Sequence, residues 1–243
     1  MESEQNKATP SQSETPAWSA RKLLRAARSG TLATSKDGQP FTALVTPATA
    51  ADGSILLLLS SLSEHTRHLR ADPRCAVMVV GQPDGPNPQT APRLTITGLA
   101  TLADPGLKSR WLARHPYADL YADFADFSLW QISASAGLLV AGFARAFRLR
   151  STDVIAASRA VAAVSAAEAD MLARYNMDYD DMLAVLAKAA GCSGDNWQMV
   201  AIDVDGCDLA NGQIAVRCAW PASVSNAEEL AEAFLRLVRQ ARG

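Results

Sequence analysis

The sequence predicts an α+β protein in which a closed or nearly closed antiparallel β-barrel precedes a small α+β domain. Six or seven short apolar segments with hairpin signals between them fill residues 18–150. Residues 165–243 instead combine helical and strand-like patterns. Hairpin-connected strands favour closure, because closure removes exposed strand edges. We therefore expect a disordered polar leader over residues 1–17, then the barrel domain, a linker over residues 151–164 and the C-terminal domain.

The composition indicates a sizeable core and no electrostatic preference for polyanions. Of the 243 residues, 49% are hydrophobic and 20% are charged, and the net charge is −2. These values are typical of a globular protein and give no reason to expect nucleic acid or an anionic membrane as a partner. The sequence offers no apolar segment long enough to span a bilayer and no apolar signal core. We expect a cytoplasmic protein.

The four cysteines, Cys75, Cys192, Cys207 and Cys218, form no CxxC pair. This spacing favours neither a zinc site nor a disulfide framework, so reduced thiols are predicted.

Two Asp-Gly dipeptides predict tight hairpin turns early in the barrel. Asp37-Gly38 and Asp52-Gly53 each separate two apolar segments, which is a strong local hairpin signal. Gly30 is predicted to end a first helix. Residues 81–92 contain four prolines and two glycines and should form a loop. The predicted barrel helices cover residues 19–29, 63–72 and 104–114, and the predicted strands cover residues 31–34, 41–46, 55–59, 75–80, 93–102, 127–133 and 137–149.

The C-terminal domain is predicted to contain three helices and a three-stranded meander. Ser165–Glu168 and Ser225–Glu228 both have the spacing of a capping box and are expected to start the first and last of these helices. The remaining predicted elements are a helix over residues 178–190 and strands over residues 197–204, 207–210 and 213–219.

A dense polar patch follows the apolar segment Ile55–Leu59. Its side chains include Ser60, Ser61, His65, Thr66 and Arg67, and Ser63 is placed to cap a short helix. Free backbone N–H groups at a helix start, the helix dipole and a guanidinium together favour a phosphate. The alternative is an ordinary capped helix whose polar side chains are solvated.

Five segments resemble the haem-utilisation branch of the pyridoxamine 5′-phosphate oxidase-like proteins. They read GTLAT, LLLLSSLSEHTRHLRADPR, APRLTITGLA, RWLARHPYADLYADFADFSLWQI and AGFARAFRL. The resemblance covers about residues 20–149 and implies an FMN-binding split β-barrel that forms a homodimer with cofactor sites at the subunit interface. Residues 165–243 resemble the small domain of uncharacterised function that often follows this barrel.

The resemblance also implies cofactor contacts. Ser60, Ser61, His65, Thr66 and Arg67 lie where split-barrel flavoproteins hold the FMN phosphate, in agreement with the anion site inferred from the residues themselves. Arg93, in the matching APRLT motif, is expected to meet the phosphate or the partner subunit, or else to be a solvated arginine at the barrel rim.

The C-terminal domain departs from its relatives, which usually carry an HMNxDH-type motif. This chain has RYNMDY over residues 174–179, so Arg174 and Tyr179 stand where two histidines would be. Arginine cannot ligate a metal, and Tyr179 is expected to serve packing, which removes histidine-based metal chemistry. Asn176 is expected to cap the following helix. We expect no metal site.

Three functions follow from these observations. The first is an FMN-binding oxidoreductase-like protein with an unknown small-molecule substrate and electron donor, in which the flavin supplies the chemistry and no catalytic residue can be named. The second is a haem-binding or haem-degrading protein, for which His65, His68 and His115 are the available imidazoles. The third is a non-catalytic module that binds a protein partner.

Overall fold

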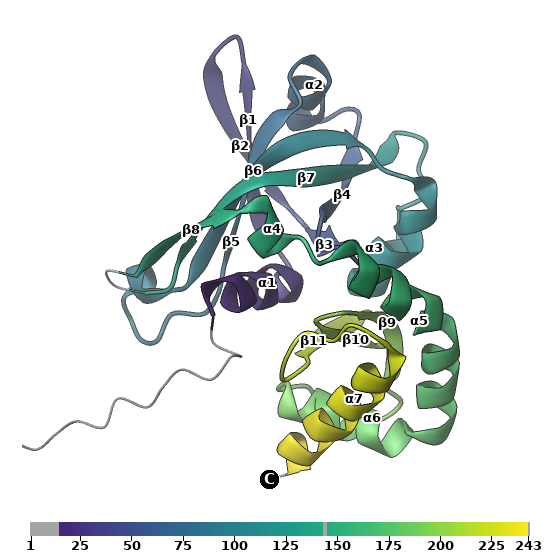
Figure 1. The fold of residues 1–243 in the computed structure, drawn as a ribbon. Coiled ribbons are helices and arrows are strands. Elements are labelled where there is room, and N and C mark those ends of the chain that lie inside the picture. Colours follow the sequence, from purple (N-terminus) through teal and green to yellow (C-terminus); the bar gives the residue numbers. More distant parts are fainter. Residues whose placement is uncertain (1–14, 143–144, 243) are drawn as a thin grey trace, which may run out of the picture.

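The computed structural model describes residues 15–142 and 145–242. An eight-stranded antiparallel sheet forms the N-terminal part, and a three-stranded sheet with helices forms the C-terminal unit (Figure 1). The helices are α1 (Pro16–Ala26), α2 (Glu64–Ala71), α3 (Lys108–Arg114), α4 (Ser151–Val154), α5 (Ser158–Asp178), α6 (Asp180–Ala189) and α7 (Ala227–Arg242). The strands are β1 (Gly30–Lys36), β2 (Gln39–Val45), β3 (Ala48–Thr49), β4 (Ile55–Ser60), β5 (Arg74–Val80), β6 (Arg93–Leu102), β7 (Phe127–Val140), β8 (Ala146–Arg150), β9 (Gln198–Asp203), β10 (Gly206–Asn211) and β11 (Ile214–Ala219).

The large sheet confirms the predicted α+β class with an antiparallel split barrel. Its strand order is β2-β1-β5-β6-β7-β4-β3, and β8 pairs with the far half of β7. Alternate residues of these strands point inward and form one apolar core, which includes Leu32, Leu57, Val77 and Ile96. A second cluster around Trp111 packs α3 against the other side of β4. Because β4 lies between these clusters, all of Ile55–Leu59 is buried, as the uninterrupted apolar segment predicts.

The two Asp-Gly turns have different consequences. Asp37-Gly38 joins β1 to β2, and both residues have positive φ, which a two-residue hairpin turn of this type requires. Asp52-Gly53 instead lies in the turn between the two-residue strand β3 and β4. The long strand β2 does not pair with β4, since its neighbour in the sheet is β1. The prediction that both turns connect successive long strands was therefore wrong for the second.

Residues 127–140 form one strand where two were predicted. β7 runs through its small-residue segment Ser133–Gly137 without a break, with a register shift opposite Thr97 and Gly98. A Cβ on Gly98 would lie 2.2 Å from the Ser133 carbonyl oxygen, so this close approach of β6 and β7 needs a glycine. β7 thus pairs with β6 along most of its length, with β4 at its first half and with β8 at its last residues.

The first helix lies earlier than predicted. α1 begins at Pro16, where a proline costs no hydrogen bond, and Thr15 caps it by accepting the Trp18 N–H. Gly30 is the first residue of β1 and does not end the helix. Residues 15–17 therefore belong to the folded part, and residues 1–14 of the predicted leader lie outside the described residues.

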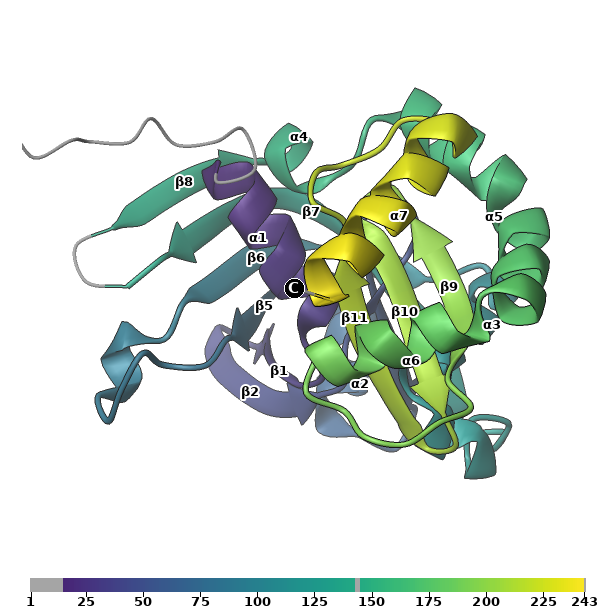
Figure 2. The ribbon, with the colours of Figure 1, turned by 90° about the horizontal axis from the view of Figure 1, so that it is seen from below.

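The C-terminal unit has the predicted meander, in the order β11-β10-β9. Figure 2 shows α6 and α7 lying across this sheet, with α5 beside β9. The opposite face of the sheet contacts α3, and α1 contacts β11. The core between sheet and helices includes Tyr175, Leu186 and Phe234.

Helix starts in the C-terminal unit differ from the sequence prediction. α5 begins at Ser158 and runs through Ser165–Glu168, and α4 and the first turns of α5 occupy the predicted linker. The alanine-rich composition of this segment explains its helicity. The cap of α7 lies at Asn226, one residue later than predicted: its side chain accepts the Glu229 N–H and donates to the Glu229 carboxylate, which also accepts the Ser225 N–H.

A buried ion cluster joins the barrel to the C-terminal unit. Asp203 accepts hydrogen bonds from Arg25 and Arg110 of the barrel and from Arg217 of its own unit, at 2.9, 3.1 and 2.6 Å. Arg25 also donates to Asp205 at 2.7 Å, and Arg110 to Glu168 at 2.9 Å. This cluster fixes how the two parts sit against each other.

Candidate functional site

The strand–helix junction predicted to bind phosphate is built as a tight turn. β4 ends at Ser60, whose hydroxyl donates to the Asp126 carboxylate at 2.5 Å and accepts the Leu62 N–H at 3.1 Å. The Ser61 N–H donates to the Asp126 carbonyl at 2.7 Å. The Ser60 hydroxyl is therefore already engaged within the chain.

The start of α2 leaves backbone N–H groups without an acceptor among the residues that the structure describes, as the predicted anion site requires. Ser63 occupies the N-cap position but makes no side-chain cap bond, and no acceptor for the N–H groups of Glu64, His65 or Thr66 is found in the described part of the chain. Arg67, however, is paired with Glu64 at 2.5 Å and donates to the Leu62 carbonyl. A phosphate here would face the Glu64 carboxylate, which opposes an anion at this position.

Two predicted site residues, Thr66 and His65, and the neighbouring His68 are held within the fold. Thr66 is buried, and its hydroxyl has no partner among the described residues. His68, one turn behind His65, is buried between the Thr34 hydroxyl, 3.0 Å from its Nδ1, and the ring of Phe41. Burial, and secondarily His68, lower the pKa of His65, so its imidazole is neutral at physiological pH.

Arg93 is not brought to this junction within one chain. It pairs with Val140, whereas Ser60 pairs with Phe127 at the other end of β7. With about 3.3 Å per strand residue, the separation along β7 is roughly 40 Å. Arg93 donates to the Gln89 and Ala91 carbonyls beside its own loop.

A broad groove of about 900 Å³ lies next to α2, over the end of β1, the start of β5 and the middle of β6. Its floor is made of small side chains, among them Ala33, Ala76 and Thr97. Lys36 and Arg74 provide two exposed cations, and Arg74 is paired with Asp72 at 2.6 Å. Of the predicted residues none lines the groove; His68 approaches it only through Thr34.

The groove is lined by two cations, Lys36 and Arg74, and by the carboxylates of Asp37 and Asp72, and its described lining contains no histidine that could ligate iron. A volume of this size accommodates a large organic ligand, and the two cations can pair with acidic groups. Burial raises the pKa of the Cys75 thiol to about 11, so it is protonated and a poor ligand. The sequence held no signal for this site, because small residues on strands are ordinary and their common face follows only from register.

His115 serves structure. It is buried against Trp111, its Nε2 lies 3.0 Å from the Pro47 carbonyl oxygen, and its Nδ1 lies 3.2 Å from the Tyr117 hydroxyl. Burial lowers the pKa of His115 to about 4, so it remains neutral in the folded protein.

The segment that replaces the relatives' histidines is also structural. Tyr179 packs edge-on against Tyr175 and Phe234, which agrees with its predicted packing role. Arg174 lies over the Tyr179 ring. Asn176 does not cap α6: it lies inside α5 and makes two hydrogen bonds to the backbone of Met199, at 2.9 and 2.7 Å. Among residues 15–142 and 145–242 no group of three potential metal ligands comes together.

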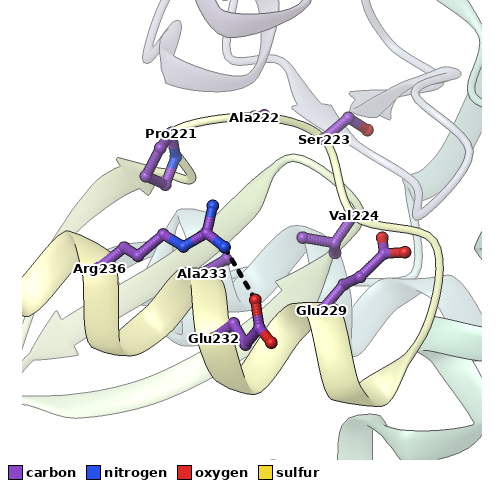
Figure 3. Close-up of a pocket in the computed structure, with 8 residues that line it drawn as sticks. All are labelled: Pro221, Ala222, Ser223, Val224, Glu229, Glu232, Ala233 and Arg236. Atoms are coloured by element: carbon purple, nitrogen blue, oxygen red, sulfur yellow. Dashed lines mark hydrogen bonds and ion pairs between the residues drawn. The ribbon is translucent and has the colours of Figure 1, made fainter.

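A smaller pocket of about 190 Å³ lies in the C-terminal unit between α7 and the loop of residues 221–224 (Figure 3). Glu232 and Arg236 pair with each other at 2.8 Å, and Glu229 is held by Ser225. Since its charged groups are satisfied locally, this pocket offers no comparable site.

The barrel domain matches a known protein family. Residues 19–141 match the family model described as Pyridoxamine 5′-phosphate oxidase. A curated relative, "Non-canonical heme oxygenase HOZ, chloroplastic" of Arabidopsis thaliana, is 36% identical over 115 residues, which are 46% of this chain and 35% of the relative. The chain thus spans about a third of the length of that relative.

Two solved structures match over both parts of the chain. The protein Atu2129 of Agrobacterium tumefaciens, of unknown function, has a TM-score of 0.75 and 24% identity, and the match covers 95% of this chain and 98% of that one. A heme binding protein from Mycobacterium smegmatis has a TM-score of 0.56 and 25% identity, over 97% of this chain and 99% of that one. The described residues include no helix that could cross a membrane.

Proposed function

The chain belongs to the pyridoxamine 5′-phosphate oxidase family, and from this premise we propose that it binds haem and serves haem utilisation. The observation that carries the proposal is the pair of haem-related proteins among its relatives. One is a heme oxygenase that is 36% identical over 115 residues, and the other is a heme binding protein aligned over 97% of the chain. The FMN-dependent oxidoreductase expected from the phosphate motif becomes the second candidate.

The groove over β1, β5 and β6 is the proposed haem site. Lys36 and Arg74 would hold the two propionate carboxylates, and the small side chains of the floor would leave room for a large planar ligand. Bound haem iron would supply the redox chemistry, and the chain would supply position and charge. Because Arg74 is already paired with Asp72, binding would exchange one carboxylate partner for another.

Haem affinity should depend on these two cations. We expect Lys36→Ala and Arg74→Ala each to weaken haem binding severalfold, because each removes a cation that would pair with a carboxylate of the ligand. Equilibrium titration of the Soret band measures this effect. Lys188→Ala, in α6 away from the groove, is the control and should bind as the wild type does. Equal affinity for all three variants would remove the groove from the proposal.

A second copy of the chain is the proposed cover of this face, in line with the homodimer expected from the family. One row of side chains crosses five strands: Leu44, Thr31, Met78, Thr95 and Leu138. Leu44 is 79% exposed and Leu138 is 41% exposed. The neighbouring row contributes to the groove floor, so a copy seated here would also close the groove and could bring a histidine to the iron, which the described groove lining of one chain lacks.

Disrupting that row should dissociate the dimer. We expect Leu138→Asp to shift the protein from dimer to monomer in sedimentation velocity, because a carboxylate would be buried without a partner. Leu235→Asp, on exposed α7, is the matched control and should leave the association state unchanged. A monomeric wild type would contradict this assembly.

FMN remains a second candidate because the N–H groups at the start of α2 are free. If a phosphate binds there, Arg67→Ala should weaken FMN binding by about 1.5–3 kcal/mol. Arg70→Ala, one turn further along the same helix, is the control. Fluorescence titration with FMN distinguishes the outcomes: unchanged affinity in the Arg67 variant takes Arg67 out of the site.

A further inference from the structure

Two cysteines of the C-terminal unit lie directly opposite each other on neighbouring strands. Cys207 of β10 is in register with Cys218 of β11. The Trp220 N–H donates to the Asp205 carbonyl at 2.9 Å, two pairs away along the same ladder. Because bonded and non-bonded pairs alternate in an antiparallel ladder, Cys207 and Cys218 form a hydrogen-bonded pair, with Cα atoms about 5.5 Å apart. This Cα separation lies within the range of disulfides, about 4.4–6.8 Å. The Cβ atoms of such a pair lie about 4.5–5.5 Å apart, so closing the bond to the disulfide range of about 3.5–4.5 Å draws the two strands slightly together.

The two thiols differ in access. Cys207 is fully buried in the core beneath the helices, whereas Cys218 is 7% exposed and borders a pocket of about 270 Å³ between α6 and α7. The other lining residues are mainly apolar, including Leu186 and Leu237. A small uncharged molecule can therefore approach Cys218 but reaches Cys207 only through it.

The two thiols also differ in acidity. A hydrogen bond from the Cys207 thiol lowers the pKa of Cys218, and the Arg217 guanidinium acts in the same direction. Burial, followed by that hydrogen bond, raises the pKa of Cys207 well above the ordinary value. A thiolate is the nucleophilic form of cysteine, so Cys218 is the reactive member of the pair.

We propose that Cys207 and Cys218 are a reversible dithiol–disulfide pair, oxidised by hydrogen peroxide that enters through the pocket beside Cys218. This role is independent of the haem proposal. It adds a reversible oxidised state to the predicted reduced thiols.

The chemistry balances in two steps. The Cys218 thiolate attacks one peroxide oxygen; an S–O bond forms, the O–O bond breaks, and the hydroxide that leaves takes up a proton to become water. This gives a sulfenic acid. The Cys207 sulfur then attacks the Cys218 sulfur; the S–S bond forms, the S–O bond breaks, and the departing hydroxide takes the Cys207 proton as a second water. The two sulfurs lose two electrons and the peroxide gains them.

The test uses the full-length reduced protein and equimolar hydrogen peroxide. We expect intact mass to fall by two hydrogens and peptide mapping without reductant to find Cys207 linked to Cys218. Dithiothreitol should restore the original mass. In Cys207→Ser, Cys218 should accumulate as a sulfenic acid that dimedone labels, because no resolving thiol remains.

The other two cysteines, Cys75 and Cys192, serve as controls for the reactivity of Cys218. Cys75 is buried with a raised pKa, and Cys192 is half-buried; neither has a cysteine opposite it. The proposal is overturned if the cross-linked peptide is absent while Cys192 is oxidised, or if Cys218 reacts with peroxide no faster than Cys75 in the wild type. The second comparison needs no variant, so it holds even where a substitution in this core prevents folding.

Discussion

Replacing Asp203 by alanine is expected to lower the free energy of unfolding by about 3–5 kcal/mol. The Asp203 carboxylate is 1% exposed and accepts hydrogen bonds from three guanidinium groups, those of Arg25, Arg110 and Arg217. Removing it leaves buried positive charges without their shared partner, which costs more than the pairs themselves contribute. Chemical denaturation of wild type and variant at pH 7 measures the difference.

The same substitution has a defined pH dependence. Burial acts to raise the pKa of Asp203, but the guanidinium groups of Arg217, Arg25 and Arg110 outweigh it and hold this pKa well below the usual range. A carboxyl whose folded pKa is depressed stabilises the fold above its unfolded pKa of about 3.9, and the contribution is lost as the pH falls below that value. The stability difference between wild type and Asp203→Ala should therefore narrow below about pH 4.

A surface ion pair is the matched control. Asp123 pairs with Lys108 but is 90% exposed, so Asp123→Ala should change the free energy of unfolding by less than about 1 kcal/mol. An Asp203→Ala variant as stable as Asp123→Ala would show that the ion cluster does not hold the barrel and the C-terminal unit together.

Trp111→Ala is expected to cost about 3–5 kcal/mol of unfolding free energy. The Trp111 side chain is 1% exposed and joins α3 to β4 through Leu56 and Leu58. Its Nε1 also donates to the Thr46 carbonyl at 3.0 Å. The alanine variant loses this packing, leaves a cavity and removes the donor from a carbonyl oxygen. Urea unfolding followed by circular dichroism gives the value.

Two further variants separate packing from hydrogen bonding at this position. Trp111→Phe keeps most of the apolar contact and removes only the donor, so its cost should be clearly smaller than that of alanine. Phe124 is 57% exposed, and Phe124→Ala should be near neutral. A Trp111→Ala variant within 1 kcal/mol of the wild type would contradict the role of this cluster.

The sequence predicted elements well where a local signal decides structure. The apolar Ile55–Leu59, the alternating Arg93–Leu102 and the Asp37-Gly38 turn all formed the expected strands and hairpin. The sequence prediction failed where the structure depends on which strands pair with each other. Nothing local shows that β2 would pair with β1 alone, or that β7 would continue through its small residues because β6 and β8 provide hydrogen bonds there.

The site was predicted less completely for the same reason. Ser60, Ser61, His65, Thr66 and Arg67 are close in sequence, and the structure does bring them together at the junction of β4 and α2. The groove depends on three strands that are far apart in sequence, so Lys36 and Arg74 had no recognisable pattern. The ion pair between Arg67 and Glu64 could not be predicted, because the same sequence spacing is compatible with an unpaired Arg67 guanidinium.

An absorbance titration of the purified full-length protein with haemin, and separately with FMN, tests the central claim most directly. The haem proposal predicts a Soret band that saturates at one haem per chain, weakens in Lys36→Ala and Arg74→Ala, and decays when ascorbate is added if the protein also degrades haem. A flavin spectrum with tight FMN binding, and no saturable Soret band, would contradict it and restore the flavin-dependent oxidoreductase. Binding of neither cofactor would contradict both and leave the protein-binding module.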